Sequence, residues 1–393
     1  MRITRFLRND AVSLAEIIET AATRTAGQVK GRHILAIQDT SDVRRNGRQS
    51  IAIHPTIAVD AGSDALLGLV HTDFLSRRGG RRETRNQRAF EDKESRRWLD
   101  GAVHAGRLLN AGAAAVTVVA DREADVYRTF ADRPEGVDLL IRARHDRVLK
   151  GGERLFEVMA EHPVLGRMMV DLPSAPGRPQ RTATLELRAR PVTITEPYHA
   201  RKPTRASAPR TLDLWLIDAL EIEPPAGQRA AHWRLLSTHQ VASLDDGRRI
   251  VGYYRQRWTI EQLFRTIKTR GFDIEMLRIA DGGPFEKLVA VSLVAAVTVL
   301  QLVRERDGVE QRPLADALDT ADQPVLEAVS DSLEGKTAKQ KNPHPKGSLA
   351  YAALVFARLG GWTGYYGKPG PVVILAGLIQ FQTMRQGWTL RDV

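Results

Sequence analysis

Two aspartates follow apolar segments whose composition predicts buried β-strands. Asp39 comes directly after HILAIQ, and Asp121 comes directly after AAAVTVVA. A carboxylate at the carboxyl end of a core strand lies where open α/β sheets bind ligands, and carboxylate oxygens are preferred by hard divalent cations. The pair therefore indicates either a metal site or ordinary turn and helix-cap residues, which is the commoner role of a single aspartate in such a place.

A helix predicted over residues 253–270 carries four further polar side chains that could do chemistry. At about 100° per residue they fall within an arc of about 60°, and they are Tyr254, Arg257, Glu261 and Lys268. An apolar stripe lies beside this arc and predicts the buried face, namely Ile260, Leu263, Phe264 and Ile267. A simple surface pair between Arg257 and Glu261, worth a few tenths of a kcal/mol, is the alternative interpretation.

The elements that must position these residues can be predicted from periodicity and turn signals. Strands are expected at 33–39, 51–61, 66–74, 113–121 and 139–144, with a turn near Gly62 and Ser63 joining an antiparallel pair. Helices are expected at 10–28 and 98–110 and from Glu123 onward, and a solvated loop at 76–97. Residues 165–235 alternate short β-like runs with Pro-, Gly- and Arg-rich turns, whereas the pattern from 244 onward is helical, with a last helical block at 348–388.

Composition narrows the class of protein. The chain has 393 residues, a net charge of +11 and no cysteine, which excludes disulfides, thiolate metal sites and a cysteine nucleophile. The positive charge fits a polyanionic partner such as nucleic acid, although a generally arginine-rich surface would give the same balance. The apolar run at 288–303 is too short to span a bilayer and predicts a buried helix. No signal peptide is visible, so a cytoplasmic location is expected.

Several segments together resemble one family. The spacing Y-x2-R-x3-E-x6-K, formed by Tyr254, Arg257, Glu261 and Lys268, resembles the signature of DDE transposases of the insertion-sequence-four type, the group of the transposon-five transposase. The segments QDTSD around Asp39, DREAD around Asp121, WRLLST at 233–238 and GSLAYAALVFARLGG at 347–361 are similar to segments of that family, in the same order. The resemblance covers most of the chain.

The resemblance implies an α/β fold with a ribonuclease-H-like catalytic core, an inserted antiparallel β-rich module and a C-terminal helical domain. The implied organisation is a remnant or linker at 1–30 after a missing N-terminal end-binding domain, the first part of the core at 31–150, the β-rich module at 151–231, the second part of the core with the Glu-bearing helix at 232–305, and a helical dimerisation domain at 306–393.

The resemblance also implies a chemistry. Asp39, Asp121 and Glu261 would be the catalytic triad and would hold two Mg²⁺ ions, with Mn²⁺ as a substitute. Two such ions stabilise the attacking and leaving oxygens of a displacement at phosphorus. Water would be the nucleophile in nicking, and a DNA 3′-hydroxyl in strand transfer. Double-stranded DNA, as transposon end and target, would be the partner of a homodimer, without a membrane.

The remaining members of the site would bind DNA. Arg257, Lys268 and Arg142 would hold phosphates, and Tyr254 would donate a hydrogen bond to one. Trp233 would stack on a base flipped out of the transposon end, as suits a hairpin intermediate; a core aromatic is its alternative role.

Other choices remain open at the level of sequence. Asp42 is a nearby alternative to Asp39. Glu123 and Asp125 are expected to be cap and surface acids, and His33, His54 and His71 are expected to be structural. Because only 38 residues precede Asp39, a short form that dimerises with full-length transposase and inhibits it is the competing function. A relic without activity is a third.

Overall fold

The computed structural model describes residues 2–45, 49–75, 94–173, 179–197, 209–269, 271–277, 279, 281–337, 340–365 and 367–391. Most of the solvated loop predicted at 76–97 lies outside these residues. The chain divides into two compact units. Unit 1 consists of residues 1–32, 40–77 and 259–393, and unit 2 consists of residues 33–39 and 78–258.

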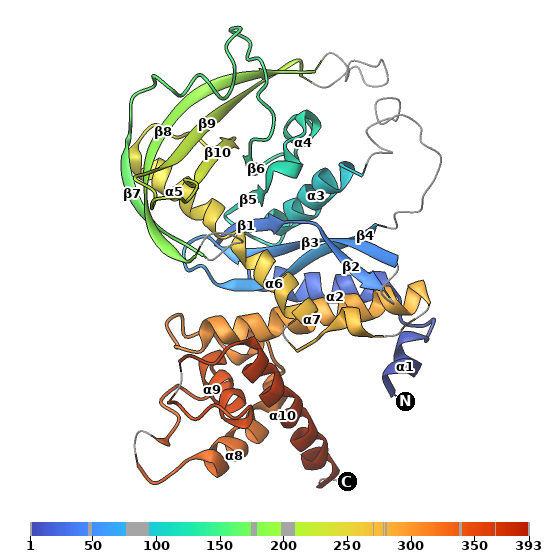
Figure 1. The fold of residues 1–393 in the computed structure, drawn as a ribbon. Helices are drawn as coiled ribbons and strands as arrows, with labels where there is room; N and C mark the ends of the chain where they lie inside the picture. The colour runs from blue at the N-terminus through green and yellow to red at the C-terminus, as the bar shows by residue number, and fades with distance from the viewer. Residues whose placement is uncertain are drawn as a thin grey trace. The chain divides into compact units, whose positions relative to one another are not determined.

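A mixed β-sheet forms the centre of unit 2 (Figure 1). Its first three strands are parallel neighbours, as expected from their apolar, β-branched sequences, and they are β1 (His33–Gln38), β5 (Ala115–Ala120) and β6 (Val137–Arg142). The sheet then continues by antiparallel pairing through β10 (His232–Ser237), β9 (Thr211–Ile222), β8 (Arg181–Thr195) and β7 (Gly166–Leu172). The mixed α/β class is confirmed, and the parallel trio with antiparallel additions is compatible with a ribonuclease-H-like core.

The β-rich region differs from the prediction in one respect. Part of the region at 165–235, where short strands and turns are expected to alternate, forms the single long strand β8, which passes through Pro191. Proline usually ends or borders a strand because it cannot donate to the ladder. Here the pairing of β8 with β9 continues on both sides of it, since Arg190 pairs with Leu216 and Val192 with Leu214.

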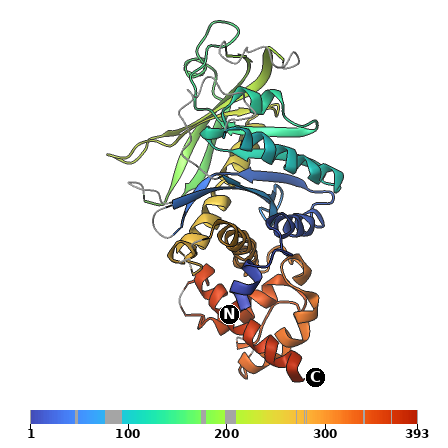
Figure 2. The same ribbon diagram turned by 90° about the vertical axis from the view of Figure 1, so that its right-hand side faces the viewer.

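Helices cover the sheet of unit 2 at the predicted places. α3 (Arg96–Asn110) packs against β1, β5 and β6, as Figure 2 shows in teal. Gly101 permits this close approach, because a Cβ on it would lie 2.6 Å from the amide oxygen of buried Gln38. The segment after Asp121 forms the short helices η2 (Arg122–Ala124) and α4 (Tyr127–Ala131). α5 (Leu244–Arg255) packs against β7 and β8.

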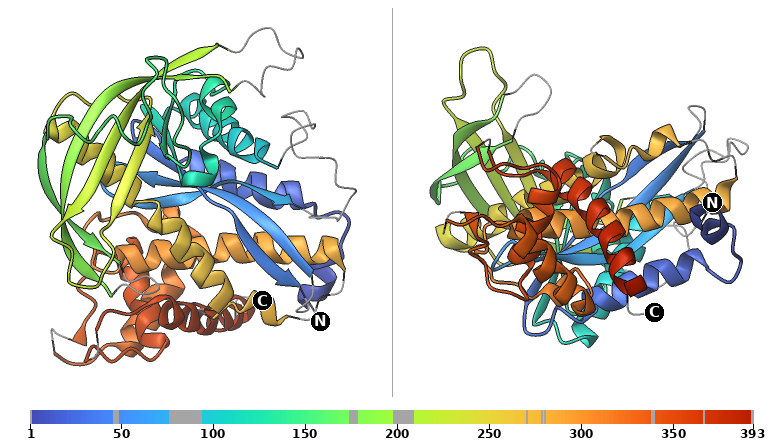
Figure 3. Two further views of the ribbon diagram at one scale, coloured as in Figure 1. Left: turned by 45° about the horizontal axis from the view of Figure 1, so that its top comes forward. Right: turned by 90° about the horizontal axis from the view of Figure 1, so that it is seen from below.

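Unit 1 contains an antiparallel group of strands, β2 (Ser41–Arg45), β3 (Gln49–Asp60) and β4 (Leu66–Leu75). The predicted antiparallel pair and its turn are thereby confirmed. Figure 3 shows α2 (Leu14–Ala26) and α7 (Gly282–Glu305), which pack against each other and against β4. The short helices α1 (Arg2–Leu7) and η4 (Ile274–Met276) contact α7 and β2, respectively.

α7 is longer than the apolar run that predicted it. Of the helices that the structure describes, it alone is long and apolar enough to cross a membrane, with a mean hydropathy of 1.9 over its most apolar window. More than half of that window, 56%, is buried inside the protein. The core helix of a soluble protein passes the same test of length and composition, so this is weak support for a membrane span.

The C-terminal helices of unit 1 share an apolar core with the end of α7. They are η5 (Leu314–Asp316), α8 (Gln323–Leu333), α9 (Leu349–Leu359) and α10 (Pro371–Arg391). The short helix η6 (Thr320–Asp322) directly precedes α8. Phe356 of α9 and Phe381 of α10 meet at its centre, with ring centroids 5.2 Å apart. Gly377 lets α10 approach α9, because a Cβ there would lie 1.8 Å from the carbonyl oxygen of Phe356.

Candidate active site

Asp39 and Asp121 follow neighbouring parallel strands at the same level of the sheet. β1 and β5 pair in parallel with Ile37 opposite Val119, so continuing that register by two residues aligns Asp39 with Asp121. Neighbouring strands lie about 4.8 Å apart. The sequence argument expected two carboxylates at the carboxyl edge of one sheet, and the topology of unit 2 provides that arrangement.

Each of the two carboxylates has a defined partner. The side chain of Asp121 accepts a hydrogen bond from the backbone amide of Glu123 at 2.7 Å and so caps η2. The Nη1 of Arg257 donates to the Oδ2 of Asp39 at 3.2 Å, and both side chains are largely buried. The capping role that sequence reasoning left open is therefore real for Asp121, and an arginine offsets the charge of Asp39.

Tyr254 lies at the centre of the same site. It is 4% exposed, and its ring packs edge-on against Trp233 with centroids 5.6 Å apart. Burial raises the pKa of its hydroxyl; Arg257 and Arg142 lower that pKa, the latter also through a hydrogen bond, and Asp121 raises it. The net shift is upward, so the hydroxyl is a neutral hydrogen-bond partner at neutral pH.

Two arginines complete this group of side chains. Arg257 lies over the rings of Tyr254 and Trp258, at 5.9 and 5.8 Å from their centroids, a geometry that favours a cation–π contact. Arg142, the last residue of β6, donates to the carbonyl of His232 at 3.0 Å. Six of the predicted site residues thus form one group in unit 2, called here the two-aspartate cluster: Asp39, Asp121, Arg142, Trp233, Tyr254 and Arg257.

The continuous helix predicted over 253–270 is wrong. α5 ends at Arg255, Gln256 and Arg257 form a turn, and α6 (Trp258–Thr269) begins immediately afterwards. Tyr254 and Arg257 therefore do not share a helix with Glu261 and Lys268, and a single helical wheel does not describe their arrangement. No Pro or Gly marks the break, so it has no local signal in the sequence.

Glu261 and Lys268 belong to α6, in unit 1. Glu261 lies in the first turn of α6, four residues after Arg257, and is half-buried. The Nζ of Lys268 donates to the Oγ of Ser41 at 2.7 Å. The predicted apolar face of α6 is confirmed, since Ile260, Leu263, Phe264 and Ile267 are all buried. The expectation that Arg257 and Glu261 lie on one helix is wrong, because Arg257 lies in the turn before α6.

Asp125 is buried, so the expectation that it is a surface acid is wrong. Its side chain pairs with Arg147 and accepts hydrogen bonds from the backbone amides of Arg144 at 2.7 Å and His145 at 3.1 Å. It therefore fixes the loop that follows Arg142. Glu123 is exposed, as expected, but it pairs with Arg97 at 3.2 Å, and the cap is Asp121 itself. The basic run ARHDR directly after β6, which contains Arg147, was the available signal for a buried acidic partner.

The three histidines that were expected to be structural make ordinary polar contacts. The ring of His33 contacts the hydroxyl of Thr117 at 2.8 Å, His54 contacts Thr40 at 2.9 Å, and His71 contacts Asp73 at 3.0 Å. These contacts agree with structural roles.

The donor set of the two-aspartate cluster suits a hard cation. Within the described ranges, no three Asp, Glu or His side chains are grouped so that they could hold a metal ion. Mg²⁺, however, is commonly bound through one or two carboxylates, with waters and substrate phosphates completing its shell. Asp39 and Asp121, which follow adjacent parallel strands, supply two such carboxylates, provided that Arg257 releases Asp39.

Comparison with known families agrees with this reading. Residues 100–297, half of the chain, match the family described as Transposase DDE domain. The matched range contains seven of the eight predicted site residues and begins after Asp39.

Proposed function

The chain belongs to the transposase DDE domain family, and we propose that it is a DNA transposase of the insertion-sequence-four type. In this proposal it hydrolyses phosphodiester bonds and transfers DNA strands with Mg²⁺, or with Mn²⁺ as a substitute. The observation that carries the proposal is the alignment of Asp39 with Asp121 after adjacent parallel strands. Hydrolysis at phosphorus needs concentrated negative ligands of this kind for its cations.

Asp39, Asp121 and Glu261 are the proposed metal ligands and catalytic residues. When bound, two divalent ions would polarise the scissile phosphate and lower the pKa of the attacking water. The side chains around them have separate tasks. Arg257, which pairs with Asp39, offsets carboxylate repulsion before DNA arrives and can then turn to a phosphate. The same exchange of partners lets Lys268 leave Ser41 for the DNA backbone, because a lysine binds phosphate as a compact charge.

Arg142 and Tyr254 would contact DNA as a linked pair. Arg142 lies near enough to Tyr254 to lower the pKa of its hydroxyl, and the guanidinium donors that do not contact His232 can bind a phosphate in a fork geometry. The predicted stacking of Trp233 on a flipped base, and hence a hairpin intermediate, requires that its ring separate from Tyr254, because only 8% of Trp233 is exposed. Trp233 therefore packs as a core aromatic in the free protein, and base stacking would be a second state.

Nicking of supercoiled plasmid DNA in Mg²⁺ or Mn²⁺ tests the proposal. Asp39→Asn, Asp121→Asn and Glu261→Gln should each abolish metal-dependent nicking while circular dichroism shows an unchanged fold. Asp213→Asn is the matched control, since Asp213 lies on β9 of the same sheet and contacts Thr193 at 2.6 Å. Full nicking by any one of the three site variants would contradict the assignment of that residue.

The competing function, inhibition of a full-length transposase by dimerisation, is favoured by one observation. α10 exposes large apolar side chains, namely Val372, Ile379, Met384 and Trp388. Exposed apolar side chains on one helix are candidates for a protein interface. Co-expression with a full-length partner separates the two functions. An inhibitor lowers transposition by that partner, and Ile379→Lys relieves the effect, whereas unchanged transposition excludes inhibition.

A further inference from the structure

Arg304, near the end of α7, connects two parts of unit 1 that no motif singled out. Its Nη2 donates to the hydroxyl of Thr259 at 2.6 Å, and its Nη1 donates to the carbonyl oxygen of Asp64. Thr259 is the second residue of α6 and is 1% exposed. A buried hydroxyl that receives a hydrogen bond from a charged group makes one of the stronger kinds of hydrogen bond in proteins.

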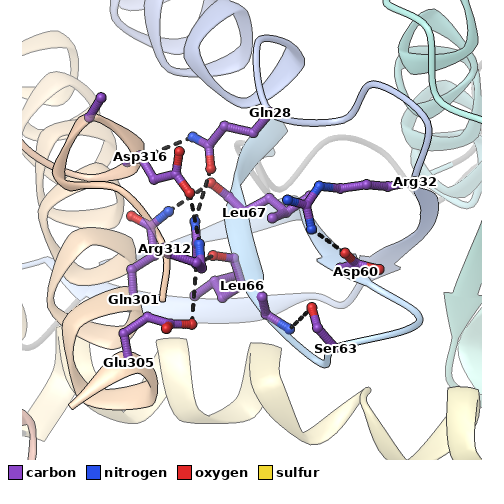
Figure 4. Close-up of polar contacts among 12 residues, drawn as sticks. Gln28, Arg32, Asp60, Ser63, Leu66, Leu67, Gln301, Glu305, Arg312 and Asp316 are labelled. Carbon is purple, nitrogen blue, oxygen red and sulfur yellow. Dashed lines mark hydrogen bonds and ion pairs between the residues drawn. The ribbon is translucent and has the colours of Figure 1, made fainter. Parts of the chain in front are cut away.

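Both ends of this connection are themselves held in place. Asp64 lies in the β3–β4 turn with a positive φ of 61°, and its amide donates to the carbonyl of Asp60 at 2.9 Å. The same stretch of α7 is attached to β4, because the side-chain amide of Gln301 donates to the carbonyl of Leu67 at 2.7 Å. Figure 4 shows Gln301 and Glu305 of α7 beside the buried Arg312. The stretch of α7 that carries Arg304 is therefore held against β4.

Thr259 and Glu261 point to different sides of α6. At about 100° per residue, Glu261 and Lys268 lie about 160° to 180° from Thr259 around the helix. Because a helix turns as a rigid body, the contact at Thr259 influences where the carboxylate of Glu261 lies. The apolar contacts of α6 are non-directional, whereas the planar guanidinium of Arg304 donates in a fixed direction.

A small rotation of α6 would have a large effect. A turn of about 20° moves an atom at a radius of about 6 Å by about 2 Å. A misplacement of only about 1 Å in a catalytic group can cost about a hundredfold in rate.

We propose that Arg304 is a positioning residue for Glu261: by its hydrogen bond to Thr259 it sets the rotation of the first turn of α6. This inference rests on the proposed function, because it requires the carboxylate of Glu261 to bind a metal ion. Arg304 itself touches neither metal nor DNA in this proposal.

Valine in place of Thr259 tests the inference with little change of shape. Thr259→Val removes the hydroxyl, Thr259→Ser keeps it, and Arg304→Gln removes the charged donor. Thr266→Val is the matched control, because Thr266 is also 1% exposed on α6 but its hydroxyl bonds within the helix, to the carbonyl of Gln262 at 2.9 Å. The readouts are the Kd for Mn²⁺, measured by electron paramagnetic resonance, and the kcat and KM of DNA nicking.

Loss of a supporting contact of this kind typically lowers metal affinity or activity by 10- to 100-fold. We expect Thr259→Val and Arg304→Gln each to weaken Mn²⁺ binding and lower kcat by about tenfold, with KM for DNA unchanged, and their combination to add little. Thr259→Ser and Thr266→Val should behave like the wild type. A general loss of stability would instead affect Thr259→Val and Thr266→Val alike.

The possible failures can be told apart. If Thr259→Val and Thr266→Val give the same Kd and kcat, positioning by Arg304 is wrong although the proposed function stands. If Glu261→Gln leaves both Mn²⁺ binding and nicking unchanged, the proposed function of Glu261 fails and the positioning inference fails with it. If the wild type binds Mn²⁺ but does not nick DNA, the Kd values for Mn²⁺ of Thr259→Val and Thr266→Val alone decide whether Arg304 positions Glu261.

Discussion

Replacing Arg312 by methionine should destabilise unit 1 strongly, because this arginine is the centre of a buried polar network. Arg312 is 4% exposed, and its Nε donates to Asp316 at 2.8 Å, its Nη1 to the carbonyl of Leu66 at 2.7 Å and its Nη2 to Gln28 at 2.9 Å (Figure 4). Glu305, also buried, lies 3.9 Å from Nη1. The network therefore joins the ends of α2 and α7 to the start of β4.

The size of the expected loss in the free energy of unfolding follows from the groups that Arg312→Met leaves unpaired. Methionine fills most of the volume but leaves carboxylates and a carbonyl without their cation, and removal of one partner of a buried ion pair costs about 3 to 5 kcal/mol. Total stabilities are only about 5 to 15 kcal/mol, so the loss is easily measured by chemical denaturation. Arg8→Met is the control, because Arg8 pairs with Asp281 at 3.6 Å on the surface, where such pairs contribute about 0 to 1 kcal/mol.

The effect should also depend on pH through Glu305. Burial raises the pKa of this carboxyl above its ordinary value of 4.5, and Arg312 lowers it, so removal of Arg312 raises it further. When the pKa of a group is higher in the folded state than in the unfolded state, the group does not destabilise the protein at pH values below its unfolded-state pKa. The destabilisation grows as the pH rises from there through the folded-state pKa. Arg312→Met should therefore lose less stability at pH 4.5 than at pH 7.5, and Glu305→Gln should restore part of the loss. Equal losses in Arg312→Met and Arg8→Met, or losses independent of pH, would refute the reasoning.

Three further substitutions have definite expected outcomes. Gly101→Ala should destabilise the protein in thermal unfolding although alanine favours helix by about 1 kcal/mol, because its Cβ would meet Gln38; no loss would show that α3 can move. Gly377→Ala should disrupt the packing of α9 with α10, since the obstacle is backbone at 1.8 Å, and an unchanged near-ultraviolet circular dichroism spectrum would contradict this. Asp125→Asn should cost about 3 to 5 kcal/mol by unpairing Arg147 and speed amide exchange at Arg144 and His145; unchanged exchange would show that Asp125 does not hold that loop.

Much of the fold was predictable from local patterns. The strands that end before Asp39 and Asp121 are continuous β-branched and apolar runs, as parallel strands buried on both faces require. The helix α3 and the apolar face of α6 follow from their 3.6-residue periodicity. For the same reason the sequence could place the two aspartates at strand ends, and the parallel pairing of β1 with β5 then aligned them.

The rest depended on contacts between residues remote in sequence. The break between α5 and α6 has no Pro or Gly to mark it, and the turn is instead occupied by Arg257, whose partner Asp39 lies 218 residues earlier. The burial of Asp125 depends on Arg147, 22 residues later. Likewise, Trp233 is covered by Tyr254 from a different element. Periodicity reports which face of an element is apolar, but not which polar side chains meet across elements.

A titration with Mn²⁺ tests the central claim most directly, namely that Asp39 and Asp121 share one metal site. Asp39→Asn and Asp121→Asn should each weaken binding by about tenfold or more, and the double variant should lose much less than the product of the two, because residues that share a ligand are not additive. Asp213→Asn should bind as the wild type does. Wild-type affinity in either single variant, or strictly multiplicative losses in the double variant, would contradict the shared site.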